Sequence, residues 1–163
     1  MIKALYPGTF DPITLGHLDI IERASQMFDE VVVAIMHNPR KQCSFDIEER
    51  LMMIKKCVAH LPNVRVIKSN DLTVVTAKEH GCKVLVRGIR AVVDYEYELA
   101  QASANMTLDE SIETIFLVSR SEYSFLSSSV AKEVAMFDGD ISKMVPSIIE
   151  EEVKARLKPM KQV

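Results

Sequence analysis

Five short apolar segments, each followed by a stretch with helical periodicity, restrict this chain to an α/β architecture. The apolar segments are residues 2–6, 31–36, 64–67, 83–87 and 113–118. The run 31–36 is rich in β-branched residues without polar alternation, which is typical of a strand buried on both faces of a sheet. Strands separated by helices form β-α-β units with parallel strands and right-handed crossovers. We therefore predict a single-domain, doubly wound (Rossmann-like) sheet of five parallel strands with helices on both faces.

Helix signals fill the intervals between these strands. Apolar residues recur at helical spacing, with polar residues between them, over 18–28, 46–58, 72–80, 92–108, 130–137 and 147–157. Asp46 with Glu49, and Ser147 with Glu150, match the capping box that begins a helix. Gly81 fits the position just after a helix C-terminus.

The segment 6–17 joins the first predicted strand to the first predicted helix. Thr14 or a neighbour would cap that helix, and Gly16 would let the backbone come close to a ligand. The free N–H groups and positive dipole at a helix start attract phosphate. His17 would point its ring into the same space, and Thr9 adds a hydroxyl. On spacing alone, a tight turn and a surface or capping histidine remain alternatives.

Basic and hydroxyl side chains follow the carboxyl ends of the predicted strands, where ligands bind in doubly wound sheets. Lys41 follows the second strand, Thr73 the third and Arg87 with Arg90 the fourth, and serines 127–129 come after the fifth. Guanidinium groups suit phosphate oxygens. Each residue alone has an ordinary alternative, such as a solvated cation or a helix cap. Their convergence on one edge of the sheet favours a phosphate-binding site.

Composition argues against several functional classes. The formal net charge is 20 − 23 = −3 and aromatic residues make up 6%, which argues against a nucleic-acid partner. No apolar run approaches the roughly 20 residues that span a bilayer, and the N-terminus lacks the pattern of a signal peptide. Cys43, Cys57 and Cys82 lack disulfide or zinc spacing. We expect a cytoplasmic protein with reduced thiols and no membrane partner.

Three motifs carry a family resemblance. Thr14-Leu15-Gly16-His17 resembles the T/H-x-G-H signature of the nucleotidyltransferase superfamily, and the segment 6–17 as a whole is similar to the phosphopantetheine adenylyltransferase family. The segments 84–91 with 94–98, and 123–129, resemble that family's later motifs, in the same order and spacing. The resemblance implies adenylyl transfer from ATP to 4′-phosphopantetheine, which gives dephospho-coenzyme A and pyrophosphate in coenzyme A biosynthesis. It also implies a magnesium requirement and a homohexamer.

The resemblance assigns roles residue by residue. His17 would be catalytic and would support the transition state, and with Thr9 it would hold the reacting phosphates. The phosphopantetheine contacts would be Thr9, Lys41, Thr73 and Arg87. The ATP contacts would be Thr9, Phe10, His17, Gly88, Ile89, Arg90, Glu98, Tyr123, Ser124, Phe125, Leu126, Ser127, Ser128 and Ser129. The resemblance spans nearly the whole chain, so we expect one nucleotidyltransferase domain over 1–163, including a helix at about 147–157, with 159–163 frayed.

The acceptor in this scheme would be a phosphate monoester, which is mostly a dianion near pH 7 because its second pKa is about 6. A general base is then unnecessary, and we expect direct in-line attack without a covalent enzyme intermediate. Few carboxylates lie on this edge of the sheet, so Mg²⁺ would sit on the nucleotide phosphates rather than on protein side chains.

Three positions depart from the family's usual pattern. Leu15 stands where a polar residue is frequent, Thr73 where Leu or Met is frequent, and Met106 where arginine is common. They affect expectations about individual contacts rather than about the reaction. Two other functions stay open: a nucleotidyltransferase with another acceptor, such as nicotinamide mononucleotide or a cytidylyltransferase substrate, and a non-catalytic nucleotide-binding module.

Overall fold

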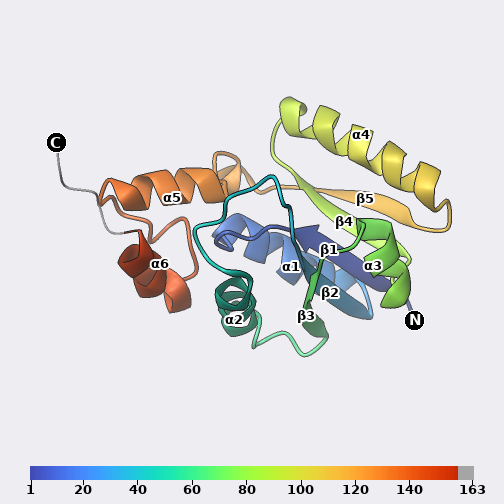
Figure 1. Cartoon of the computed structure of the whole chain (residues 1–163), viewed down its shortest axis with the longest axis horizontal. Coiled ribbons are helices and arrows are strands. Elements are labelled where there is room, and N and C mark those ends of the chain that lie inside the picture. The colour runs from blue at the N-terminus through green and yellow to red at the C-terminus, as the bar shows by residue number, and fades with distance from the viewer. Residues whose placement is uncertain (158–163) are drawn as a thin grey trace.

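One parallel sheet forms the centre of the molecule. The computed structural model describes residues 1–157. Its strands are β1 (Lys3–Gly8), β2 (Glu30–Met36), β3 (Val64–Ser69), β4 (Val84–Ile89) and β5 (Glu113–Val118). They are all parallel and lie in the order β3-β2-β1-β4-β5 (Figure 1). This confirms the predicted doubly wound fold and places its switch point between β1 and β4.

Within residues 1–157, six helices connect and cover these strands. They are α1 (Leu15–Met27), α2 (Ile47–Cys57), α3 (Thr73–Glu79), α4 (Val92–Leu108), α5 (Ser128–Met136) and α6 (Glu150–Arg156), with short 3₁₀ turns η1 (Ser121–Tyr123) and η2 (Ser147–Ile149). The predicted helices are thus present, although α5 begins two residues earlier than expected. The expected fraying of 159–163 lies outside the described residues. No helix within 1–157 is long and apolar enough to cross a membrane.

Helices cover both faces of the sheet, as predicted. Side chains alternate along β1, so Ala4 and Tyr6 join one core cluster while Leu5 joins another. The larger cluster packs the sheet against α1, α2, α5 and α6, and the smaller one packs it against α3. Helix α4 lies beside β4 and α3 (Figure 1).

Helix α4 differs from the others because it leaves most of its apolar side chains in solvent. Only Glu98 and Ala102 are buried along its 17 residues. Its exposed large apolar side chains are Val92, Val93, Tyr95, Tyr97, Leu99, Met106 and Leu108. So many exposed apolar side chains on one helix make α4 a candidate interaction surface.

One predicted capping box is confirmed and the other is wrong. Asp46 accepts a hydrogen bond from Glu49 N at 2.8 Å, and the Glu49 side chain accepts one from Asp46 N at 2.9 Å. Ser147 instead begins the 3₁₀ turn η2, in which Ile149 N donates to Pro146 O at 3.1 Å. The tight turn buries Ile149 completely. Helix α6 therefore begins at Glu150, without a side-chain cap.

Replacing Asp46 or Ser147 by alanine should change the free energy of unfolding by different amounts. Asp46→Ala removes a working N-cap and is expected to lower the free energy of unfolding by about 1 kcal/mol. Ser147→Ala removes an exposed hydroxyl that caps nothing, and we expect a change within about 0.5 kcal/mol. Urea denaturation of both variants measures the difference; equal losses would contradict the assignment of the two helix starts.

Candidate active site

A cavity of about 780 Å³ opens at the carboxyl ends of the strands, at the switch point. Its volume is in the range of sites that hold drug-sized ligands. The predicted residues that line it are Thr9, Phe10, His17, Lys41, Thr73, Arg87, Gly88, Arg90, Glu98, Leu126, Ser127, Ser128 and Ser129. Ile89, Tyr123, Ser124 and Phe125 are not part of the lining. Segments far apart in the chain thus meet at one site.

His17 is fixed by a reciprocal contact with Thr14 at the start of α1. Its backbone N–H donates to Thr14 Oγ1 at 3.2 Å, and Thr14 N–H donates to the imidazole Nδ1 at 3.0 Å. Because Nδ1 accepts a hydrogen bond, the neutral ring carries its proton on Nε2. The ring also packs edge-on against Phe10, with the centroids 5.0 Å apart.

The surroundings keep His17 uncharged. Burial, together with the nearby Arg90 and Arg87 guanidinium groups, lowers the pKa of His17 to about 4. A neutral imidazole with a proton on Nε2 is a hydrogen-bond donor toward a ligand. It is poorly suited to act as a general base through that same nitrogen.

The loop after β1 is held close to the core. Phe10 has a positive φ of 50° and is only 2% exposed, so its ring packs inside rather than facing solvent. A Cβ on Gly8 would lie 3.0 Å from that ring. A side chain at position 8 would therefore force the Phe10 ring to shift, and any contact of residue 10 with a nucleotide would come mainly from its backbone.

Arg87 is held by two neighbours. Its guanidinium donates to both carboxylate oxygens of Glu98 at 2.7 Å and also to Pro7 O. Such a bidentate pair fixes the plane of the guanidinium. The predicted ATP contact Glu98 is thus 8% exposed and engaged with Arg87 through both oxygens.

Arg90 connects two parts of the rim. It pairs with Asp94 at 3.1 Å and donates to Leu126 O. This ties the junction of β4 and α4 to the segment that leads into α5. Asp94 and Tyr97 also line the cavity, and the sequence reasoning did not select them.

The three serines at the start of α5 have different tasks. Ser127 caps the helix by accepting from Val130 N at 3.1 Å, and Ser128 Oγ donates to Pro12 O at 2.7 Å. Within residues 1–157, no hydrogen bond involves the Ser129 hydroxyl. Ser129 and the N-terminus of α5 therefore face the cavity with free donors, and so does the N-terminus of α1 at Gly16.

The sequence reasoning missed an ion pair in the site. Asp11, 5% exposed, accepts from Lys132 Nζ at 2.8 Å and from the backbone N–H groups of Ser44 and Phe45, both at 2.9 Å. Burial acts to raise the pKa of Asp11, but these hydrogen bonds outweigh it and hold the pKa below its ordinary value. The signal in the sequence was Lys132, which lies one helical turn after Ser128 and so on the same side of the helix.

Lys41 and Thr73 line the cavity on the side of β2 and β3. Lys41 Nζ lies 3.5 Å from Thr9 Oγ1, and within the described residues it has no carboxylate partner. This ammonium group is thus available to an anion.

The site offers no ready set of metal ligands. No group of three or more His, Cys, Asp or Glu residues in the described part of the chain could hold a metal ion. The three carboxylates around the cavity are each paired with a cation: Asp11 with Lys132, Asp94 with Arg90 and Glu98 with Arg87. A divalent ion would fit only if the ligand's own phosphates supplied most of its coordination.

Two solved structures share this fold. A putative nicotinate-nucleotide adenylyltransferase from Vibrio parahaemolyticus superimposes with a TM-score of 0.68, at 19% identity, over 96% of each chain. A lipopolysaccharide core biosynthesis protein from Thermoplasma volcanium GSS1 gives 0.57, at 24% identity, over 74% of this chain and 98% of that one. At these identities the likeness concerns the fold.

Sequence comparison is more specific. Residues 5–134 match the Cytidylyltransferase-like family model. The phosphopantetheine adenylyltransferase of Synechococcus sp. (strain CC9311) is 51% identical over 153 residues, which is 94% of this chain and 96% of that protein. The enzyme of the same name from Gloeothece citriformis (strain PCC 7424) is 52% identical over 150 residues, which is 92% of this chain and 96% of that protein. The chain therefore belongs to the phosphopantetheine adenylyltransferase family of nucleotidyltransferases.

Proposed function

We propose that this protein transfers the adenylyl group of ATP to 4′-phosphopantetheine, giving dephospho-coenzyme A and pyrophosphate. The observation that carries the proposal is the single cavity that gathers His17, Lys41, Arg87, Arg90 and Lys132 beside two helix N-termini. Cations and free N–H groups together suit two phosphorylated substrates that must be held close to each other.

The two substrates would divide the cavity. Thr9, Lys41, Thr73 and Arg87 would receive phosphopantetheine; three of these four lie on the β1, β2 and β3 side. Gly88–Arg90, the backbone of Phe10 and the start of α5 would receive ATP. Glu98 would act through Arg87, which it orients. Tyr123, Ser124 and Phe125 lie outside the cavity lining, so their contact with ATP would be at its rim.

The reaction needs little proton transfer by the protein. The acceptor phosphate is mostly ionised near pH 7 and would attack the α-phosphate directly, in line with the departing pyrophosphate. Neutral His17 would donate its Nε2–H to phosphate oxygens as charge grows in the transition state. Lys41, Lys132 and the arginines would stabilise the remaining negative charge.

Magnesium would arrive with the nucleotide, because the site carboxylates are already paired with cations.

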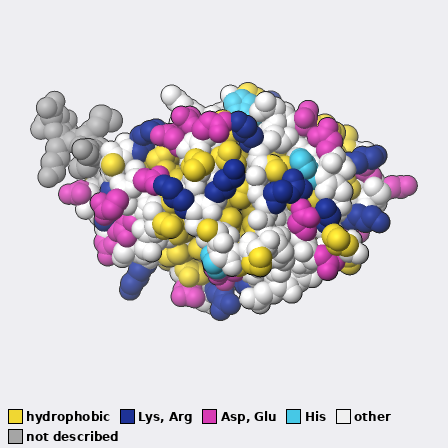
Figure 2. All heavy atoms as spheres, turned by 90° about the horizontal axis from the view of Figure 1, so that it is seen from below, with side chains coloured by type: hydrophobic (Ala, Val, Ile, Leu, Met, Phe, Trp, Pro, Cys, Tyr) yellow, Lys and Arg dark blue, Asp and Glu magenta, His cyan; other side chains and the backbone are white. Residues whose placement is uncertain are grey.

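The exposed apolar side chains of α4 support self-association, and a homohexamer is our proposal from the family resemblance. Figure 2 shows Lys and Arg side chains spread among acidic and hydrophobic ones on the face it displays, which gives no support to a nucleic-acid partner. We propose a cytoplasmic location. We also propose one nucleotidyltransferase domain over 1–163, because α6 packs into the same core as α1.

A pyrophosphate-release assay tests the function directly. With ATP and Mg²⁺, we expect release on adding 4′-phosphopantetheine but not nicotinamide mononucleotide, nicotinate mononucleotide or glycerol 3-phosphate; CTP in place of ATP should be a poor donor. Release with a different acceptor would assign another nucleotidyltransferase reaction. Binding of ATP without release for every acceptor would indicate a nucleotide-binding module.

Replacing the histidine should affect the chemical step. We expect His17→Ala to lower kcat by about 10²-fold or more, because one donor to the transition state is lost. Circular dichroism should show an intact fold. His60→Ala, which removes an exposed ring paired with Glu22, is a matched control and should keep wild-type turnover. Near-normal turnover of His17→Ala would remove this residue from the mechanism.

The protonation state of His17 can be measured in the free protein. NMR titration of its imidazole should give a pKa near 4, well below the ordinary 6.5. Between these values the unfolded chain binds a proton that the native state does not. Stability therefore falls with acid from pH 6.5 to about 4, by at most about 1.4 kcal/mol per pH unit for this group. His17→Gln should lack this contribution, and a midpoint near 6.5 would contradict the neutral donor.

A further inference from the structure

The short segment from Ser44 to Asp46, which links the loop after β2 to α2, has all of its backbone polar groups engaged. Ser44 N and Phe45 N both donate to the buried Asp11. Arg50, 4% exposed, donates from Nε to Phe45 O at 3.1 Å and to Asp46 O at 3.3 Å. Its Nη1 also reaches Thr9 O at 2.9 Å. These bonds fix residues 44–46, which we call the anchor, at the end of the loop that carries Lys41.

One contact of the anchor comes from a distant helix. Arg156, in α6, donates to Ser44 O at 2.9 Å and pairs with Glu49. Glu49 in turn accepts from Asp46 N. The guanidinium carbon of Arg156 also lies 5.3 Å from the centre of the Phe45 ring. A single side chain therefore holds the anchor through a carbonyl, a carboxylate and an aromatic ring.

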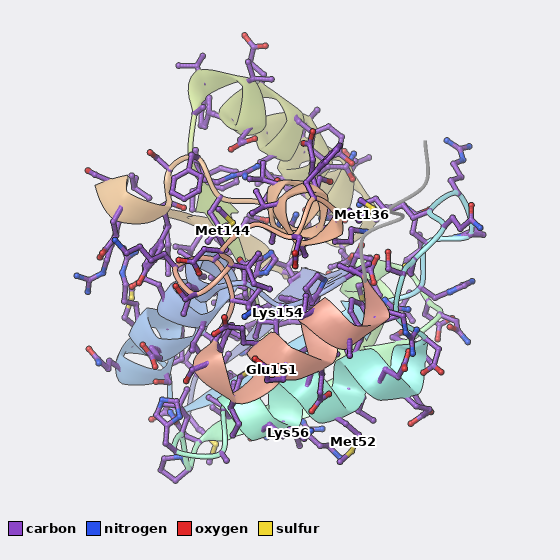
Figure 3. All side chains as sticks on the ribbon, turned by 90° about the vertical axis from the view of Figure 1, so that its left-hand side faces the viewer. Met52, Lys56, Met136, Met144, Glu151 and Lys154 are labelled. Carbon is purple, nitrogen blue, oxygen red and sulfur yellow. The ribbon has the colours of Figure 1, made fainter. Side chains whose placement is uncertain are left out.

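Beside these contacts, the packing between α2 and α6 leaves a gap. A second cavity, of about 310 Å³, lies between α2 and α6 and is lined by Phe45, Glu49, Met53, Glu152, Ala155 and Arg156. Figure 3 shows α6 lying alongside α2, with Lys56 on α2 and Lys154 on α6 labelled. Lys56 pairs with Glu152 between the same two helices but forms no hydrogen bond or ion pair with residues 44–46. Arg156 is thus the member of this interface that reaches toward the active site.

We propose that Arg156 is a positioning residue for the acceptor side of the active site. By fixing Ser44 and Phe45, it keeps their N–H groups on Asp11, which holds Lys132 in the cavity. It also fixes one end of the loop 38–43, and so limits the positions of Lys41 relative to Thr9. The inference rests on the proposed function in assigning Lys41 to phosphopantetheine; the structural coupling does not depend on that assignment.

Amide hydrogen exchange tests the coupling without measuring activity. Arg156→Gln removes the guanidinium bond to Ser44 O and the ion pair with Glu49, and so loosens the segment 44–46. The amides of Ser44 and Phe45 should therefore exchange at least about tenfold faster. Arg156→Lys keeps the charge beside Glu49 but lacks the planar fork, and we expect the same increase. Lys56→Gln, which removes another ion pair between α2 and α6, should leave these two amides at the wild-type rate. Unchanged exchange in both Arg156 variants would overturn the proposal.

Steady-state kinetics separate positioning from a purely structural role. Arg156→Gln should raise KM for 4′-phosphopantetheine by about three- to tenfold while KM for ATP stays within about twofold. Lys56→Gln should change neither. Faster exchange with unchanged KM values would show that Arg156 stabilises the segment without serving the site. Absence of turnover with this acceptor in the wild-type protein would refute the proposed function, while the exchange result would still decide the coupling.

Discussion

The active site depends on β1 pairing in parallel with both β2 and β4. Because the chain crosses over in opposite directions on the two sides of β1, the segments that follow β1 and β4 separate and leave a crevice between them. His17 enters this crevice from the first segment, Arg90 enters it from the second, and Arg87 enters it from β4 itself. The strand order therefore brings together groups that lie some 70 residues apart in the chain.

Several cations can lie in one cavity because most of them are paired with a carboxylate of the protein. Arg87, Arg90 and Lys132 each have a carboxylate partner on the protein side. Such pairing lowers the cost of withdrawing a cation from water and also fixes its direction. Arg87 and Arg90 also help keep His17 neutral, since a positive imidazole beside two guanidinium groups would be repelled. The arginines thus help set the charge of the histidine, while the hydrogen bond from Thr14 sets its tautomer.

The sequence was a good guide wherever local chemistry decides the structure. The five strands were identifiable from their apolar runs, and the capping box at Asp46 was identifiable from its spacing. The second capping box failed because burial of Ile149 required a tight turn that local spacing does not report. Among the site residues, Lys132 and Asp11 were missed because an ion pair between residues 121 positions apart leaves no periodic signal.

The chain by itself determined the α/β class, the position of the first motif and the family, since these follow from periodicity and from contiguous residues. Only the tertiary structure decided how the serines divide their tasks, that Glu98 binds Arg87, and that Arg156 reaches Ser44. The physical reason is that a hydrogen bond depends on distance and direction in space, and these are fixed only when separate segments pack together.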